Sequence, residues 1–132
     1  MFAILLGLAS AVPVAVDDGA TRAAILATCH DNIDGQLQGD VVRVEGSLHP
    51  DVVMRAVATS SGHAPGALES ETLLASTRRG ELTLPEAKWR RSREMLSMSG
   101  NVAVVRLETP DFVSFDVPGN FDGAWRIVHS CK

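Results

Sequence analysis

The chain has 132 residues, of which 45% are hydrophobic and 21% charged, and its formal net charge is -4. This length suits one domain with a single core, and the composition is unlike that of disordered chains. An acidic chain gives phosphates no general attraction, so nucleic acid is excluded as an expected partner. The densest basic cluster, "KWRRSR" at residues 88–93, is short, and we interpret it as a solvated strand face or edge.

The first sixteen residues form an apolar extension that resembles a secretory signal peptide. Residues 2–9 would be its hydrophobic region and residues 9–11, Ala-Ser-Ala, its cleavage site, although no Lys or Arg precedes them. The stretch is shorter than the roughly 20 residues that cross a bilayer, so no membrane span is expected. We expect a periplasmic or secreted protein, the alternative being a cytoplasmic protein with a buried extension. Residues 17–132 are predicted to form a single domain.

Cysteine and histidine usage argues against a metal centre. The two cysteines, Cys29 and Cys131, are too few for a disulfide framework or a thiolate zinc site. An exported protein could join them in one bridge, and two buried thiols are the simpler expectation. The four histidines are scattered without the spacing of metal ligands, so no metal or cofactor is predicted.

Helical signals dominate the first part of the chain. Asp17 and Asp18 offer capping oxygens to a helix that runs through Leu37, and Gly39 is predicted to end it. A short helix is expected over residues 41–48, followed by a strand over 51–57, a loop over 60–66 and a helix over 69–79.

Pro50 disfavours helical geometry at the residue before it, His49. We therefore interpret His49 as a residue at the end of the second helix, where an imidazole can bond the last carbonyl groups. A position at the rim of a pocket is the alternative.

The C-terminal third is rich in β-strand signals. Four runs, at residues 88–100, 101–109, 111–117 and 124–131, are separated by turn residues, which indicates an antiparallel meander. Helices followed by consecutive strands favour an α+β architecture in which the helices cover one face of the sheet.

Strand alternation predicts which side chains share a face. In the last strand it groups Trp125, Ile127, His129 and Cys131, so His129 is expected among apolar neighbours on the covered face. In the preceding strand Asp116 alternates with Phe115, and either could face inward.

Four segments together resemble the putative lumazine-binding branch of the nuclear transport factor 2-like superfamily. They are "AAILATCHDNIDGQLQGD", "LHPDVV", "GNVAVVRLETPDFVSF" and "FDGAWRIV", and the resemblance covers about residues 21–129. It implies a cone-shaped α+β fold, in which a strongly curved antiparallel sheet wraps around the long first helix and leaves a pocket. It also implies a homodimer formed through the outer face of the sheet. The superfamily includes both enzymes and non-catalytic binding domains, so the fold leaves function open.

The steroid isomerases of that superfamily use a carboxylate base and two hydrogen-bond donors to an enolate oxygen. Laid over that pattern, the chain carries Asn32 at the tyrosine donor's position, Ala56 at the base's and Val117 at the second acid's. The isomerase machinery is therefore absent.

The remaining candidates for a site are a few polar groups and their apolar neighbours. His129, with Asp116, is the candidate for general acid–base work. The candidate ligand-binding residues are Asn32, Cys29, Trp125, Ile127, His129 and Phe115.

Three functions remain open. The leading hypothesis is a domain that binds a small organic molecule in a mostly apolar pocket. The first alternative is a cofactor-independent lyase, isomerase or hydrolase that uses His129. The second is a non-catalytic dimerisation or interaction module.

Overall fold

The computed structural model describes residues 13–57 and 65–132. The predicted signal-peptide core and cleavage site, and most of the predicted loop at residues 60–66, lie outside the described residues. Export therefore stays a prediction. No helix in the described part of the chain is both long and apolar enough to span a membrane.

Two consecutive helices, α1 (Gly19–Gln38) and α2 (Val41–Ser47), form where the capping residues predict them. The Asp18 carboxylate accepts a hydrogen bond from the Thr21 N–H at 2.8 Å, which caps the start of α1. Gly39 ends α1 with a φ of 72°, a left-handed conformation that glycine adopts without strain. The Asp40 carboxylate then caps α2 by accepting from the Arg43 N–H at 3.1 Å.

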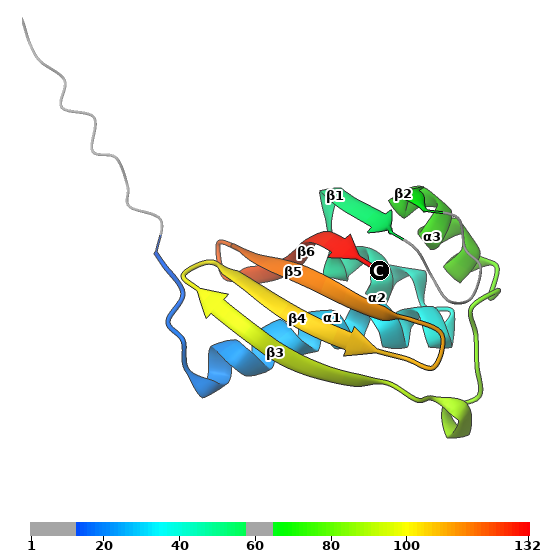
Figure 1. Ribbon diagram of the computed structural model, residues 1–132, viewed down its shortest axis with the longest axis horizontal. Coiled ribbons are helices and arrows are strands. Elements are labelled where there is room, and N and C mark those ends of the chain that lie inside the picture. Colours follow the sequence, from blue (N-terminus) through cyan, green and yellow to red (C-terminus); the bar gives the residue numbers. More distant parts are fainter. Residues whose placement is uncertain (1–12, 58–64) are drawn as a thin grey trace, which may run out of the picture.

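A six-stranded sheet forms one layer of the molecule (Figure 1), with the strand order β2-β1-β6-β5-β4-β3. Neighbouring strands are antiparallel except β1 and β6, which run parallel. The sheet is curved and unclosed, with β2 and β3 at its edges. The strands are β1 (Leu48–Ala56), β2 (Gly66–Leu68), β3 (Ser92–Ser99), β4 (Val102–Glu108), β5 (Val113–Phe121) and β6 (Ala124–Cys131).

The helices lie on one face of this sheet, as the α+β prediction requires. Helix α1 contacts β3, β4, β5 and β6, while α3 (Ser70–Arg78) packs against α2 and β1. A single 3₁₀ turn, η1 (Glu86–Lys88), interrupts the segment that returns from α3 to β3.

The core lies between α1, α2 and the covered face of the sheet. The Thr28 hydroxyl of α1 donates to the Trp125 carbonyl of β6 at 3.1 Å, which ties the helix to the sheet inside the core. The buried apolar cluster consists of Ile25, Cys29, Val44, Leu48, Ala103, Val105, Trp125 and Ile127.

The region around His49 differs from the expectation. Helix α2 ends at Ser47, and the Leu48 N–H bonds the Glu45 carbonyl, so His49 belongs to β1 rather than to a helix end. Its Nδ1 accepts from the Asp51 N–H at 3.1 Å, and its ring stacks on Phe121 with centroids 4.5 Å apart. The predicted helix-capping role of His49 is therefore wrong in detail, and its contacts are those of a strand residue.

Two further features of the sheet were not predicted. Strand β2 forms at the end of the predicted loop, where no strand was expected. Strand β1 pairs in parallel with β6, whereas an all-antiparallel sheet was expected. The β1–β6 pairing joins segments far apart in the chain, so no turn signal reveals it. Strand β2 has only three residues, too few for a recognisable alternating pattern.

Candidate functional site

A register shift between β5 and β6 decides which side chains face the helices. Pro118 pairs with Ile127, but the preceding residue, Val117, pairs with His129. Val128 is therefore an extra residue on β6, a β-bulge, and it reverses the alternation of the side chains that follow it.

The bulge turns His129 and Cys131 to the outer face of the sheet, away from the helices. His129 pairs with Val53 of β1, which is 50% exposed, and Cys131 pairs with Phe115 of β5, which is 44% exposed. The expected inward orientation of His129 and Cys131 is therefore wrong, because strict alternation of side chains assumes a strand without an extra residue. Phe115, a candidate ligand-binding residue on a strand whose inner face was left open, also lies on the outer face.

The same bulge brings a different residue inward. Ser130 pairs with Asp116, and both face the helices together with Ser114. The carboxylate of Asp116 is 3% exposed and accepts a hydrogen bond from the Ser130 hydroxyl at 2.6 Å. Asp116, which the sequence left undecided between the two faces, is thus an inward-facing residue.

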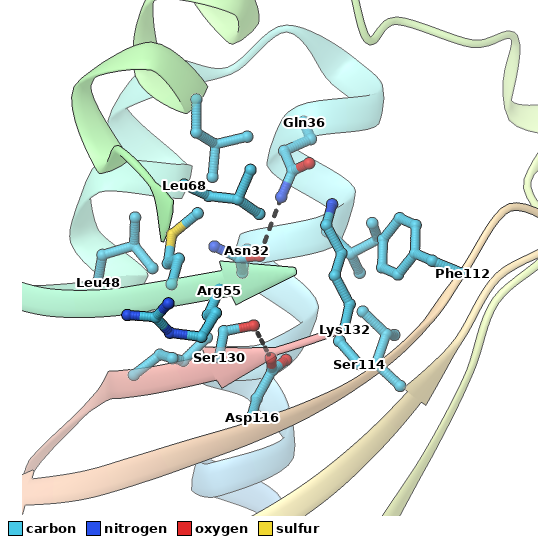
Figure 2. A pocket seen from close by; sticks show the side chains of 15 residues that line it. Asn32, Gln36, Leu48, Arg55, Leu68, Phe112, Ser114, Asp116, Ser130 and Lys132 are labelled. Carbon is cyan, nitrogen blue, oxygen red and sulfur yellow. Dashed lines mark hydrogen bonds between the residues drawn. The ribbon is translucent and has the colours of Figure 1, made fainter. Parts of the chain in front are cut away.

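These side chains line a recess of about 50 Å³ between α1 and the sheet (Figure 2). Asn32 and Gln36 of α1 lie on one side of it, and Asp116 and Ser130 on the other. The remaining lining is largely apolar and comes from β1, β2, α3, β4 and β6: Leu48, Met54, Leu68, Leu73, Leu107 and Ile127.

Burial sets the electrostatics of Asp116. Because the carboxyl group has little access to water, burial raises its pKa above the ordinary value of 3.8. The hydrogen bond from Ser130 and the charge of Lys132 oppose this shift by favouring the ionised form. The recess therefore contains a carboxyl group whose pKa is higher than that of an exposed aspartate.

Lys132 and Arg55 are the basic residues that line the recess. Lys132 is the one with a described contact to another lining side chain. Its ammonium nitrogen lies 4.4 Å from the centroid of the Phe112 ring, a cation–π contact. Burial lowers the pKa of Lys132, and the charge of Asp116 acts in the opposite direction. In Figure 2 the side chain runs along the recess toward Gln36, beside Phe112.

Amide groups are held in place on the helical side. The Gln36 Nε2 donates to the Asn32 Oδ1 at 2.9 Å, and the Asn32 Nδ2 donates to the Ser47 Oγ at 3.3 Å. Ser47 in turn donates to the Val44 carbonyl at 2.6 Å. This chain fixes the orientation of two amides that border the recess.

A larger hollow of about 290 Å³ adjoins the recess beside the C-terminal end of α1. The two spaces share Ile33, Gln36 and Phe112 as lining residues. Glu81–Arg91, the segment between α3 and β3, forms much of the wall of the hollow and is called the strap below.

Three contacts hold the strap. The Leu84 N–H donates to the Leu37 carbonyl at 3.1 Å, and the Trp89 indole Nε1 donates to the Leu84 carbonyl at 2.9 Å. Arg91 then makes a two-pronged ion pair with the buried Asp34 of α1, at 2.6 and 2.9 Å. The strap is therefore fixed to the last turns of α1 at two points, Leu37 and Asp34.

The sizes of the two spaces decide what each can hold. A volume of about 50 Å³ has room for only a few water molecules, whereas ligand pockets typically measure about 300–1,000 Å³. The hollow, at about 290 Å³, comes close to that range. A small molecule would therefore lie in the hollow and could reach into the recess only with a narrow polar end.

The candidate residues from the sequence separate into three groups. Asn32, Ile127 and Asp116 line the recess. Cys29 is fully buried in the core, where burial raises the pKa of its thiol, and Trp125 borders a different depression beside Val14 and Ala15. His129 and Phe115 lie on the outer face.

Other lining residues escaped the sequence reasoning. Ser130 and Lys132 were placed on the wrong face because nothing in the sequence marks the bulge at Val128. Trp89 belongs to the basic segment 88–93, for which the sequence predicts a solvated strand face or edge. In the structure Trp89 lines the hollow, because the strap packs back against α1. Within residues 13–57 and 65–132, no group of three or more His, Cys, Asp or Glu side chains could hold a metal ion.

Comparison with solved structures identifies the fold. A nuclear transport factor 2-like protein of unknown function from Silicibacter pomeroyi DSS-3 is 15% identical, with a TM-score of 0.70 over 85% of this chain and 93% of that one. One from Methylobacillus flagellatus KT, also of unknown function, is 15% identical, with a TM-score of 0.70 over 91% and 95%. A ketosteroid isomerase-like protein from Erwinia carotovora atroseptica SCRI1043 is 14% identical, with a TM-score of 0.54 over 86% and 95%. At these identities the likeness concerns the fold alone.

No match was found among curated proteins. Residues 20–131, which include all the helices and strands except the first residue of α1, match the family described as "Putative lumazine-binding". The chain therefore belongs to this putative lumazine-binding family, within the nuclear transport factor 2-like superfamily.

Proposed function

We propose that the protein binds a small organic molecule beside the C-terminal end of α1, with the body of the ligand in the hollow and a polar group at the recess. The observation that carries the proposal is that the two spaces adjoin. Ile33, Gln36 and Phe112 line both of them, so a ligand in the hollow would lie against the entrance to Asp116 and Ser130. A mostly apolar space with a few fixed polar groups is typical of a ligand site.

His129 lies on the outer face of the sheet, away from the recess, so the geometry does not support an enzyme that uses His129 there. Asp116 is the catalytic candidate that does face the recess, and a buried carboxyl group with a raised pKa is suited to general acid–base work. Catalysis by Asp116 stays a prediction, and binding is the function that the geometry supports best.

A blocking substitution tests the binding proposal. The neutral dye N-phenyl-1-naphthylamine, which fluoresces strongly in apolar surroundings, serves as the probe together with lumazine as a competitor. Gln36→Trp places a large ring at the junction of the two spaces and should weaken dye binding by at least about tenfold, the equivalent of about 1.4 kcal/mol. Gln38→Trp, on the exposed side of the same helix, is the matched control and should leave the dye affinity unchanged.

Equal dye binding by the wild type and both variants would show that the dye binds elsewhere, and it would contradict the proposal. Absence of dye binding by the wild type would also count against it. Competition by lumazine would identify its ring system as an acceptable ligand, whereas dye binding without lumazine competition would leave the site in place and exclude that ring system.

We also propose that two copies of the chain pair through the outer face of the sheet. Val53 and Phe115, which are 50% and 44% exposed, lie on this face with the half-buried Val104, Val117 and His129. Exposed apolar side chains gathered on one sheet face are typical of an interface between subunits.

A charge at the centre of this face should separate the two copies. We expect Phe115→Glu to yield a monomer in light scattering or sedimentation at concentrations where the wild type is a dimer, because the new carboxylate would be desolvated in the interface. Val42→Glu changes an exposed apolar residue of α2, 76% exposed, and should leave the dimer intact. A monomeric wild type, or a dimeric Phe115→Glu variant, would rule out this interface.

A further inference from the structure

Both lysines of the chain, Lys88 and Lys132, lie at the proposed site. Lys88 lines the hollow and Lys132 lines the recess. The ammonium nitrogen of Lys132 lies 4.4 Å from the centroid of Phe112, and that ring borders both spaces. The two ammonium groups are therefore carried by adjoining parts of one site.

The charge of this site is opposite in sign to that of the whole chain. The net charge of the chain is -4, yet the basic side chains that line the two spaces outnumber the acidic ones, Glu81, Asp111 and Asp116. A concave surface lined mainly by one sign of charge concentrates ligands of the opposite sign. The basic side chains are Arg55, Lys88, Arg90, Arg91 and Lys132.

Two of these three acidic groups already have partners. Glu81 makes an ion pair with Arg79 at 2.6 Å, and Asp116 accepts the Ser130 hydroxyl at 2.6 Å while buried. Asp111 is exposed at the rim of the hollow. In contrast, none of the ion pairs within residues 13–57 and 65–132 involves Lys88, Arg90 or Lys132.

Flat ring surfaces lie beside these cations. The Trp89 indole is fixed by its hydrogen bond to Leu84, and the guanidinium carbon of Arg91 lies 4.8 Å from its ring centroid. Phe112 provides a second ring at the junction of the hollow and the recess. A planar ligand can pack against such rings while a charged group at its edge meets an ammonium group.

We infer that the site prefers a small planar organic anion, such as an aromatic carboxylate, to a neutral molecule of the same shape. This inference rests on the proposed function, since it concerns the same hollow and recess. The anionic group would meet Lys132 or Lys88, and its ring would lie against Trp89 and Phe112. The ammonium group of Lys132 is half-buried and has no carboxylate within ion-pairing distance in the described chain, so an anion at the recess would give it a partner.

A pair of competitors that differ only in charge tests the inference. Displacement of N-phenyl-1-naphthylamine is measured with 2-naphthoate and with 2-naphthamide, which share one ring system. We expect 2-naphthoate to bind about tenfold more tightly, the effect of one charge-assisted hydrogen bond. The advantage should shrink between low and high sodium chloride because salt screens partly exposed charges.

Three variants assign the preference to named residues. Lys132→Met and Lys88→Met keep long apolar stems, so at least one of them should reduce the advantage of 2-naphthoate to about threefold or less while leaving 2-naphthamide unaffected. Arg22→Met removes an exposed cation on α1 that is paired with Asp17, and it should change the affinity for neither competitor.

The outcomes separate this inference from the proposed function. Equal affinities of the two competitors, with dye binding still abolished by Gln36→Trp, would overturn the anion preference and leave the binding site standing. An advantage of 2-naphthoate that survives in both lysine variants would likewise contradict the assignment. A dye affinity that is unchanged in Gln36→Trp would contradict the proposed binding site itself.

Discussion

Asp116 is the residue whose environment most clearly links structure to a measurable property. Its folded-state pKa is raised by burial, so the native protein holds this proton more tightly than the unfolded chain does. Between the ordinary pKa of 3.8 and the raised value, the native state therefore binds more protons, and this residue's contribution to stability falls as pH rises.

Asp116→Asn should remove that dependence, because the amide has no titrating proton and its oxygen can still accept from Ser130. We expect the free energy of unfolding of the variant, relative to the wild type, to become more favourable as pH rises above 3.8 and to level off above the raised pKa of Asp116. Urea denaturation at several pH values measures this difference. The exposed Asp51→Asn is the control, and parallel pH curves for the wild type and Asp116→Asn would contradict the burial argument.

His129 shows where reasoning from single residues fails. A histidine between apolar neighbours in a strand is expected on the covered face, and Ile127 does lie there. The extra residue at Val128 reverses the pattern, so the inward polar group is the hydroxyl of Ser130. Residue types could nominate Asp116 and Asn32, but only the strand pairing shows which residues accompany them.

At the scale of elements, the junction of α1 and α2 depends on a close approach at Gly35. A Cβ atom at this position would lie 2.8 Å from the Val44 Cγ2 and 3.1 Å from the Asp40 carbonyl oxygen. The two helices can therefore pack this tightly only because residue 35 has no side chain.

Gly35→Ala should destabilise the protein by about 1–3 kcal/mol, because the crowding outweighs the gain in helix propensity. Gly46→Ala in α2 is the matched control, since a Cβ there has no atom within 4 Å, and it should be neutral or stabilising. Thermal or urea denaturation compares the two variants. A Gly35→Ala variant as stable as the wild type would show that α2 can shift to relieve the contact.

The ends of α1 were predictable from the sequence because their signals are local. Asp18 and Gly39 each act through contacts within a few residues, and α1 begins and ends at these positions. Strand β2 has only three residues, too few for a recognisable alternating pattern. The parallel pairing of β1 with β6 joins segments far apart in the chain. No turn residue encodes such a pairing, which is why it was missed.

For the molecule as a whole, the cone fold was predicted by the order of its motifs, while the space inside it was not. The resemblance implied a pocket between sheet and helix, and the structure divides that space into a recess of about 50 Å³ and a hollow of about 290 Å³. Volume depends on how side chains such as Leu68, Leu73 and Phe112 fill the interior, and a sequence pattern carries no such information. The proposed site therefore lies mainly in the hollow beside the C-terminal end of α1.

The two tryptophans allow the most direct test of this location. Trp89 lies in the wall of the hollow, and Trp125 is 8% exposed in the core beside another depression. In a ¹H–¹⁵N correlation spectrum recorded during titration with N-phenyl-1-naphthylamine, we expect the indole N–H signal of Trp89 to shift and that of Trp125 to stay in place. Movement of the Trp125 signal with an unchanged Trp89 signal would contradict binding in the hollow.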